Sequence, residues 1–284
     1  MASSMKSKVK SKKAKPVSRD DGRGESRRPK NSPLSTHNSQ LIYGVSPVLE
    51  ALRADTRRVD KVLIADGSRE ARLSEIIEHC RTRSIAWNRV PSEQFAKHLA
   101  SGVNHQGVIA FTAARDYVST DEILDNATDP PLIALLDGVE DPRNLGAILR
   151  VAECAAIDGV VIPERRAVGL TDTVAKSSAG AIEYVRVAKT TNLNRFIEEL
   201  KERNIWVVGT SADAEMDYTA WDWTRPTALV LGGEGTGLHR LVAENCDVLV
   251  KIPMYGKIDS LNVSVAAGVI LFEAKRQRLL ATDN

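Results

Sequence analysis

The 284-residue sequence predicts an α/β fold built around a mainly parallel sheet. Short apolar runs, such as 132–136, 160–162 and 228–231, alternate along the chain with segments of helical periodicity. These runs are apolar almost without interruption, which is typical of strands that helices cover on both faces. With 43% apolar residues, the chain can form one large domain or two modest ones.

The first 40 residues differ in composition from the rest. They hold eleven Lys or Arg and three acidic residues, a net charge of +8 against a chain total of +2, which leaves −6 for the remainder. A basic segment rich in Ser, Pro and Gly cannot bury enough apolar surface to fold. We predict a disordered tail over 1–40, serving as an electrostatic arm for a polyanion or as a solubilising extension.

Residues 41–112 form a first predicted module of α/β type. Ser46 is expected to cap its first helix, with Pro47 at the first helical position. Residues 113–131 are polar and end in two prolines, which predicts a linker with a helical turn at 121–124. The module's other expected elements are strands at 62–64, 85–90 and 108–112 and helices at 69–83 and 92–99.

Residues 132–284 continue the alternation as a second predicted domain. A strand at 132–136, a helix from Pro142 to about Ile157 and a strand at 160–162 make one βαβ unit. A long helix over 260–280 closes the chain. Between these we expect helices at 171–178, 193–203 and 238–244 and strands at 184–187, 205–209, 228–231 and 248–252.

The composition excludes several classes of protein. No run of about 18 apolar residues indicates a transmembrane helix, and the N-terminus lacks the apolar core of a secretory signal. The cysteines Cys80, Cys154 and Cys246 are odd in number, far apart and without a CxxC pair. They are expected to be buried free thiols in a reducing, cytoplasmic setting, and no metal site is predicted.

Three loops follow strands in the second domain, where ligands gather outside the carboxyl ends of a parallel sheet. The first is DPRNLGAILR, residues 141–150, with Asn144 in the first turn of a helix and Arg150 in its otherwise apolar interior. Taken alone, Asn144 could be a cap and Arg150 a structural ion pair. Gly146 is costly inside a helix and suggests a close approach.

The second loop is the glycine-rich run 232–237, GGEGTG. It lacks both GxxxxGK[ST] and GxGxxG, so it is not a known phosphate cradle. A carboxylate at its centre, Glu234, would repel a pyrophosphate and suits a ligand with a neutral or cationic part. A plain glycine turn with a surface Glu is the alternative.

The third loop is SLNVSV, residues 260–265, at the start of the closing helix. Ser260 and Asn262 lie where the free N–H groups of a first helical turn need partners. Small residues follow in the next turn, which permits close packing. The stretch predicts either a helix cap or the floor of a binding site.

Together the three loops are more specific than each one alone. NLGAILR, LVLGGEGTGL and IPMYGKIDSLNVSVAAG resemble, in this order, the three motifs of the SpoU (TrmH-like) branch of the SPOUT superfamily of RNA 2′-O-ribose methyltransferases. Residues 41–112 resemble the ribosomal-protein-L30-like substrate-binding domain of its rRNA-modifying members. The likeness covers about 41–280, and the basic tail lies outside it.

The resemblance implies a parallel sheet whose chain threads a deep trefoil knot, against the usual rule that loops are not threaded. It further implies a homodimer and a pocket for S-adenosylmethionine. The implied cofactor contacts are Thr210, Gly232, Ile252 and Leu261. The implied catalytic set is Asn144, Arg150, Glu234, Ser260 and Asn262, and all five are present.

The implied reaction is methyl transfer to a ribose 2′-OH of ribosomal RNA, with a guanosine of 23S rRNA as the expected target. Because a guanidinium group keeps its proton at neutral pH, we expect Arg150 to stabilise charge, although this family's matching Arg has been proposed as a general base. The alternatives are a tRNA 2′-O-methyltransferase, an antibiotic-resistance rRNA methylase and a non-catalytic ribosome-assembly factor. A nicotinamide-dependent dehydrogenase would need the missing GxGxxG.

Overall fold

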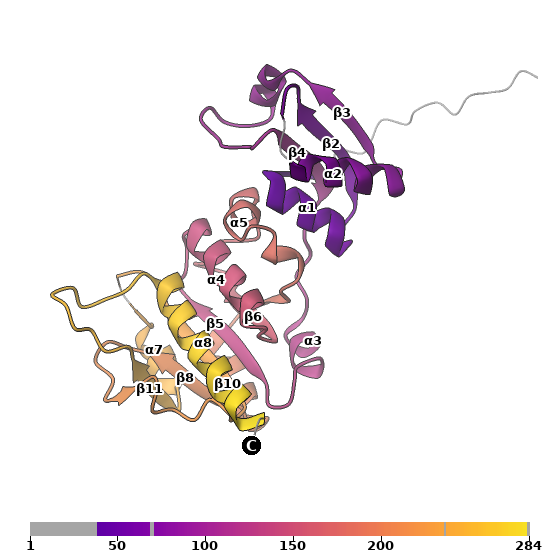
Figure 1. Cartoon of the computed structure of the whole chain (residues 1–284). Coiled ribbons are helices and arrows are strands. Elements are labelled where there is room, and N and C mark those ends of the chain that lie inside the picture. The colour runs from indigo at the N-terminus through magenta and orange to yellow at the C-terminus, as the bar shows by residue number, and fades with distance from the viewer. Residues whose placement is uncertain (1–38, 69–70, 236, 283–284) are drawn as a thin grey trace, which may run out of the picture. The chain divides into compact units, whose positions relative to one another are not determined.

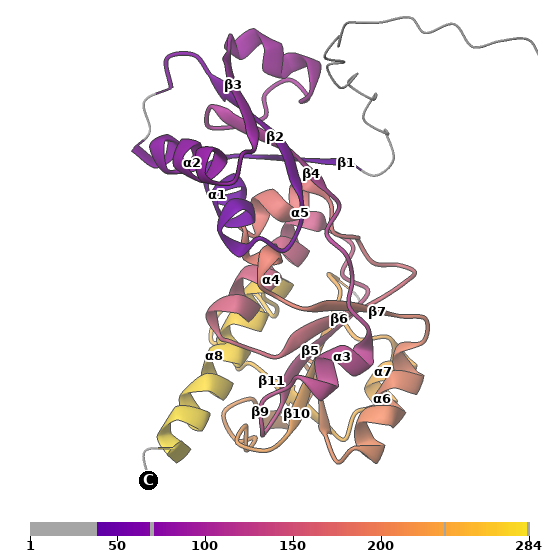
Figure 2. The same ribbon diagram turned by 90° about the vertical axis from the view of Figure 1, so that its right-hand side faces the viewer.

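The structure, a computed structural model, describes residues 39–68, 71–235 and 237–282. The predicted tail over 1–40 therefore lies almost wholly outside the described residues. Two sheets organise the described chain, one of four strands and one of seven (Figures 1 and 2). Among the described residues, no helix combines the length and the apolarity needed to cross a lipid bilayer.

The four-stranded sheet has the order β1-β4-β2-β3, in which β2 and β3 run parallel and the other pairs are antiparallel. Successive residues of β2 face opposite sides: Val62 and Ile64 pack with the helices α1 and α2, whereas Leu63 packs with Phe95 of the 3₁₀ turn η1. The elements are β1 (Ser39–Tyr43), α1 (Val45–Ala54), β2 (Val59–Ala65), α2 (Ala71–Thr82), β3 (Ala86–Val90), η1 (Ser92–Lys97) and β4 (Val108–Ala113).

The first helix starts earlier than the sequence predicted. It begins at Val45, directly after Gly44, whose φ of 96° makes the turn out of β1. The prediction of Ser46 as its cap is therefore wrong, and Pro47 lies within the first turn. The turn needs a left-handed backbone position, and Gly44 supplies it without strain.

The seven-stranded sheet has the order β7-β6-β5-β10-β8-β11-β9, and every pair in it is parallel. This confirms the predicted parallel α/β fold. The strands are β5 (Leu132–Asp137), β6 (Gly159–Pro163), β7 (Val187–Thr190), β8 (Trp206–Thr210), β9 (Met216–Asp217), β10 (Thr227–Gly232) and β11 (Val248–Lys251).

Helices cover both faces of this sheet, as the apolar strands predicted (Figures 1 and 2). In β5, Ala134 and Leu136 belong to the core that includes α4 and α8, while Ile133 and Leu135 pack with α6 and α7 on the other face. The helices are α3 (Thr120–Asp125), α4 (Pro142–Cys154), α5 (Asp172–Ser177), η2 (Ala181–Glu183), α6 (Leu193–Glu202), α7 (Arg240–Asn245) and α8 (Val263–Thr282).

Some predicted boundaries in this domain are wrong. The helix α4 ends at Cys154 instead of Ile157, and α8 begins at Val263 instead of Ser260. The strand expected at 184–187 starts only at Val187, because Tyr184 and Val185 donate backbone hydrogen bonds to Ala181 and close a 3₁₀ turn. The short edge strand β9 was not predicted.

Helix α4 packs closely against helix α5 at Gly146. A Cβ on Gly146 would lie 1.9 Å from Ser177 Oγ, so its close approach is to helix α5 and not to a ligand.

Cys80 is buried and Cys246 half-buried, and burial raises the pKa of their thiols to about 11 and about 12. Cys154 is exposed at the end of α4, which contradicts the prediction of three buried thiols.

A buried ion pair joins the two sheet-forming regions. Arg57, between α1 and β2, donates to Glu183 of η2, and both side chains are almost fully excluded from solvent. Thr56 donates to the second carboxylate oxygen at 3.0 Å. The predicted limits of the domains, at 41–112 and 132–284 with a linker between them, stay predictions, as does the knot.

The last turns of α8 are fixed by a guanidinium group. Arg278 donates hydrogen bonds of 2.6 to 3.0 Å to the carbonyls of Pro130, Pro131, Trp223 and Arg225. These carbonyls lie just before β5 and β10, so one side chain ties the helix to the starts of two neighbouring strands. Burial lowers the pKa of Arg278, and its four contacts use the donors of its planar fork.

We predict that Arg278→Lys destabilises the fold, because an ammonium group cannot reproduce the planar fork. The expected loss is about 1–3 kcal/mol in the free energy of unfolding, measured by urea denaturation. Arg276→Lys is the matched control, since Arg276 is exposed and pairs with Glu273 of its own helix. Equal unfolding midpoints for the two variants would contradict the role of Arg278.

Candidate active site

The sheet order brings the three predicted loops to one edge. The strands β5, β10, β8 and β11 are neighbours and parallel, so their carboxyl ends, at Asp137, Gly232, Thr210 and Lys251, meet along the same edge. The loop before α4, the glycine loop and the segment before α8 all leave from this edge.

A hydrogen-bonded cluster joins the three loops. Asn144 Nδ2 donates to Glu234 Oε1, and Asn262 Nδ2 donates to the same oxygen at 3.0 Å. Asn262 also donates to Asn144 Oδ1 at 3.0 Å. Asn144 and Glu234 are 90 positions apart in the sequence, and Asn144 and Asn262 are 118 positions apart. Three of the five predicted catalytic residues thus meet at one carboxylate.

Helix capping fixes the two amides. Asp141 caps α4 by accepting from the backbone N–H of Arg143 at 2.7 Å, which places Asn144 in the buried first turn. Asn262 Oδ1 accepts from the backbone N–H of Ser264 at 2.9 Å and from its hydroxyl at 2.6 Å. Asn262, and not Ser260, is therefore the residue that caps α8.

The glycine loop approaches backbone too closely for side chains. A Cβ on Gly232 would lie 2.2 Å from the carbonyl carbon of Gly237, and one on Gly233 would lie 2.2 Å from the carbonyl oxygen of Gly138. The Gly233 N–H donates to the Asp137 carbonyl at 2.8 Å, and Gly237 donates back to Gly233 at 3.2 Å. This compact turn holds Glu234 toward the cluster.

Arg150 and Ser260 do not join the cluster. Both are exposed, and neither side chain makes a hydrogen bond or ion pair with another described residue. Arg150 lies on the solvent side of α4, together with Arg143 and Cys154. Within one chain, the structure thus brings the predicted amides and carboxylate together but leaves the predicted guanidinium outside.

The four predicted cofactor residues lie at the same edge as the cluster. Thr210, Gly232 and Ile252 end or follow the adjacent strands β8, β10 and β11. Thr210 Oγ1 donates to the Val230 carbonyl at 3.2 Å, and Leu261 is 41% exposed just before α8. A nearby carboxylate at Glu234 fits a ligand with a positive charge better than a pyrophosphate.

A carboxylate–imidazole pair at this edge was missed by the sequence reasoning. Asp137, at the end of β5, is 6% exposed. It accepts from His239 Nδ1 at 2.9 Å and from the His239 backbone N–H at 2.7 Å. The available signal was an aspartate that ends an otherwise apolar strand, LIALLD, with a histidine just beyond the glycine loop.

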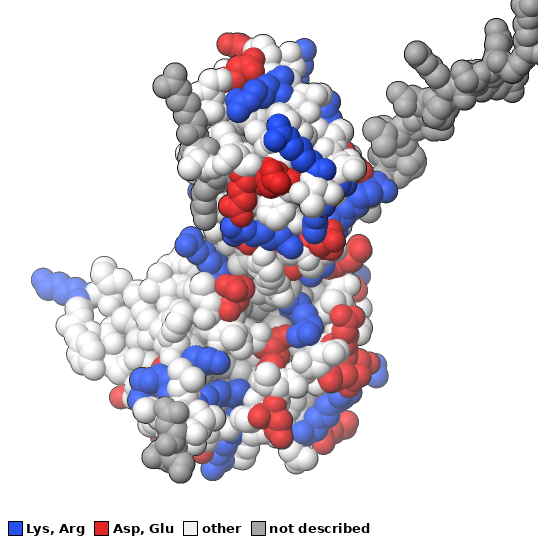
Figure 3. All heavy atoms as spheres, turned by 45° about the vertical axis from the view of Figure 1, so that its right-hand side comes forward, with Lys and Arg blue, Asp and Glu red and all other residues white. Residues whose placement is uncertain are grey.

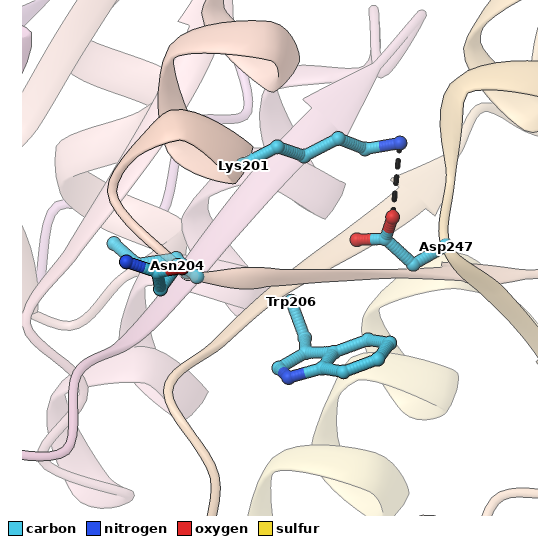
Figure 4. Close-up of a pocket in the computed structure, with 5 residues that line it drawn as sticks. Lys201, Asn204, Trp206 and Asp247 are labelled. Carbon is cyan, nitrogen blue, oxygen red and sulfur yellow. Dashed lines mark ion pairs between the residues drawn. The ribbon is translucent and has the colours of Figure 1, made fainter.

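Two cavities lie at opposite ends of the strands. One of about 370 Å³ is lined by Asn144, Glu234 and His239. The other, of about 210 Å³, lies at the amino end of β8, where Lys201 pairs with Asp247 at 3.0 Å beside Trp206 (Figure 4). Because parallel α/β sheets bind ligands at their carboxyl ends, the first is the candidate site.

Comparison with known families agrees with this geometry. A family profile described as "SpoU rRNA Methylase family" matches residues 131–272, and one described as "RNA 2'-O ribose methyltransferase substrate binding" matches residues 41–118. The chain belongs to the SpoU rRNA methylase family. This confirms the family that the three motifs indicated.

Relatives match along most of the chain. This chain is 45% identical over 240 residues to the putative TrmH family tRNA/rRNA methyltransferase YacO of Bacillus subtilis (strain 168). The match covers 84% of this chain and 95% of the relative. This chain is also 43% identical over 241 residues to the 23S rRNA (guanosine-2'-O-)-methyltransferase RlmB of Ralstonia nicotianae, covering 84% and 96%.

A solved structure gives the same fold. The SpoU methyltransferase AviRb from Streptomyces viridochromogenes, in complex with the cofactor AdoMet, superposes with a TM-score of 0.72 at 25% identity, covering 86% of this chain and 92% of that one. The roles of the individual site residues stay predictions.

We predict that Gly233→Ala disrupts the site more than the fold. The new methyl group would overlap the Gly138 carbonyl, so the loop must shift and Glu234 must lose its two amide donors. Calorimetric titration with S-adenosylmethionine should show at least a tenfold loss of affinity, about 1.4 kcal/mol. Gly256→Ala is the control, because a Cβ there meets nothing nearer than 4.0 Å. Unchanged affinity in Gly233→Ala would refute this loop geometry.

Proposed function

We propose that the protein transfers a methyl group from S-adenosylmethionine to the ribose 2′-OH of a guanosine in 23S rRNA, in the cytoplasm. The observation that carries the proposal is the Asn144–Glu234–Asn262 cluster, which assembles three family motifs at the ligand-binding edge of the sheet. Relatives named for this reaction match the chain over nearly their full length, which supports the assignment of the substrate.

The cofactor would be held by Thr210, Gly232, Ile252 and Leu261, and the deep trefoil knot expected for this family belongs to the same proposal. Bound there, S-adenosylmethionine supplies an electrophilic methyl group on a positively charged sulfur. The Glu234 carboxylate favours that charge. The chain's own task is to align the hydroxyl with the methyl within about 3–3.5 Å.

The five predicted catalytic residues divide into three roles. Asn144 and Asn262 fix Glu234 and form one wall of the site. Arg150 stabilises the negative charge that develops on the ribose oxygen, or holds an adjacent RNA phosphate. Ser260, exposed before α8, is free to contact the ribose of the substrate.

A homodimer is part of the proposal. Val265, Phe272 and Leu279 of α8 are about half exposed and recur every seven residues, so they form one apolar stripe. Met254, Tyr255, Ile258 and Leu261, in the loop before α8, extend the exposed apolar surface. Figure 3 shows a broad uncharged surface on the region that carries the seven-stranded sheet. A second copy would cover this stripe and bring its own α4 surface, with Arg150, to the cluster.

A second candidate function is methylation of a tRNA ribose, which the name of the Bacillus subtilis relative includes. Mapping 2′-O-methyl groups in 23S rRNA and in tRNA, by primer extension at low nucleotide concentration in a deletion strain, separates the two. Loss of one 23S rRNA methyl group on deletion, restored by the gene, is expected. Loss confined to tRNA would contradict the proposed function.

We predict that Arg150→Ala folds and binds S-adenosylmethionine but loses at least about 100-fold in methyl transfer, the scale of removing one charge-stabilising group. Transfer of tritiated methyl to 23S rRNA measures the loss. Arg143→Ala, on the same exposed side of α4, is the control for lost positive charge and should change RNA affinity at most. Near-normal transfer by Arg150→Ala would remove Arg150 from the catalytic set.

We also predict that Phe272→Glu converts a dimer into monomers, because a charge in the middle of an apolar interface is not compensated. Sedimentation equilibrium measures the mass, and the methyl-transfer rate should fall with it. Arg276→Glu, an exposed change one turn further along α8, should keep the mass of the unaltered protein. If the unaltered protein is a monomer, the dimer proposal is wrong.

A further inference from the structure

The Asp137–His239 pair lies in the candidate site but belongs to none of the predicted roles. A carboxylate cannot donate, so Nδ1 of His239 carries the proton of the 2.9 Å hydrogen bond. That leaves Nε2 as the free ring nitrogen, and it has no hydrogen-bond partner among the described residues. The second Asp137 oxygen accepts from the His239 backbone N–H, so both the ring and the main chain are held.

The imidazole ring is oriented yet accessible. Its side chain is 48% exposed, whereas that of Asp137 is 9% exposed. His239 lines the same 370 Å³ cavity as Asn144 and Glu234. The pair therefore presents a nitrogen lone pair on the wall of the cavity that contains the motif residues.

The proposed reaction needs such a lone pair. When a ribose 2′-OH takes up a methyl group, its proton must leave, and a group that accepts it in the transition state speeds the step by about 10²–10⁴-fold. A guanidinium group, such as that of Arg150, has donors and no acceptor. Glu234 Oε1 already accepts from Asn144 and Asn262. Imidazole is the side chain suited to exchange a proton near neutral pH.

We propose that His239, oriented by Asp137, is the general base of this enzyme, an inference that rests on the proposed function. Nε2 takes the proton of the 2′-OH as the ribose oxygen forms its bond to the methyl carbon. The bond from that carbon to sulfur breaks, and its electron pair stays on sulfur, giving neutral S-adenosylhomocysteine. The imidazolium, stabilised by the Asp137 carboxylate, then releases the proton to water.

Other charged groups lie in the same cavity or on the helix that follows His239. Asp137 comes from the end of β5. The other acidic and basic side chains line the cavity or lie on α7. They are Glu140 and Asp141 before α4, Arg166 after β6, Glu234 in the glycine loop, and Arg240 and Glu244, which pair with each other at 2.7 Å. Asp137 is the one that hydrogen-bonds the ring, so its removal should affect the base most.

The test is single-turnover methyl transfer to 23S rRNA by the full-length protein, followed from pH 5.5 to 9. With the unaltered protein, the rate should rise with pH and then level off as the base loses its proton. His239→Gln should lower the plateau rate at least 100-fold and abolish that rise. Added imidazole should partly restore His239→Gly, which a merely structural role would not allow. Asp137→Asn should lower the rate with S-adenosylmethionine affinity retained.

Arg240→Gln, one residue further along, is the control and should keep the pH profile of the unaltered protein. Calorimetry with S-adenosylmethionine and filter binding of 23S rRNA separate chemistry from binding. A normal rate and pH profile in His239→Gln overturns the proposal, and so does a loss confined to RNA or cofactor affinity. If the unaltered protein methylates no 23S rRNA, the proposed function itself fails, which is a distinguishable result.

Discussion

The architecture of the site depends on one carboxylate oxygen. Glu234 Oε1 accepts from Asn144 and Asn262, and these contacts join α4, the glycine loop and the start of α8. Each partner is fixed independently: Asn144 by the capped first turn of α4, Asn262 by its own capping of α8, and Glu234 by the compact glycine turn. The charge-assisted contacts therefore set geometry more than they add stability, because Glu234 is exposed.

The sheet makes this convergence possible. Helices cover both faces of β5, so the loops that leave its carboxyl end have little freedom of direction. The neighbours β10 and β8 run parallel to β5 and to each other, which places their loops side by side. At the other end, the Arg278 fork holds the starts of β5 and β10. The strands are thus held at both ends, which keeps the loops of the site in place.

Sequence periodicity predicted much of this fold and one part of the site. Unbroken apolar runs such as 132–136 were enough to predict a covered parallel sheet, because burial on both faces determines their composition. The grouping of Asn144, Glu234 and Asn262 was implied by the resemblance of the three motifs to those of the SpoU family. The start of α8 was misplaced because Ser260 and Asn262 are equally good caps in sequence, and only the fold shows which one meets the free N–H groups.

Other features could not be read from local pattern. The pairing of Asp137 with His239 spans 102 residues and depends on how the glycine loop returns to β5. The exposure of Arg150 depends on which side of α4 faces the sheet, and a single basic residue in an apolar helix does not show that. The strand β9 has two residues, too few for any periodicity.

The glycine loop restricts how this protein can change during evolution. At Gly232 and Gly233 neighbouring backbone excludes any side chain, and at Gly235 and Gly237 a positive φ penalises one. Substitutions that alter the site while sparing the loop's shape are therefore expected away from these four glycines. A lineage adapting to a different RNA would be expected to change surfaces outside the loop, because His239 serves the proposed chemistry and the four glycines leave little room for side chains.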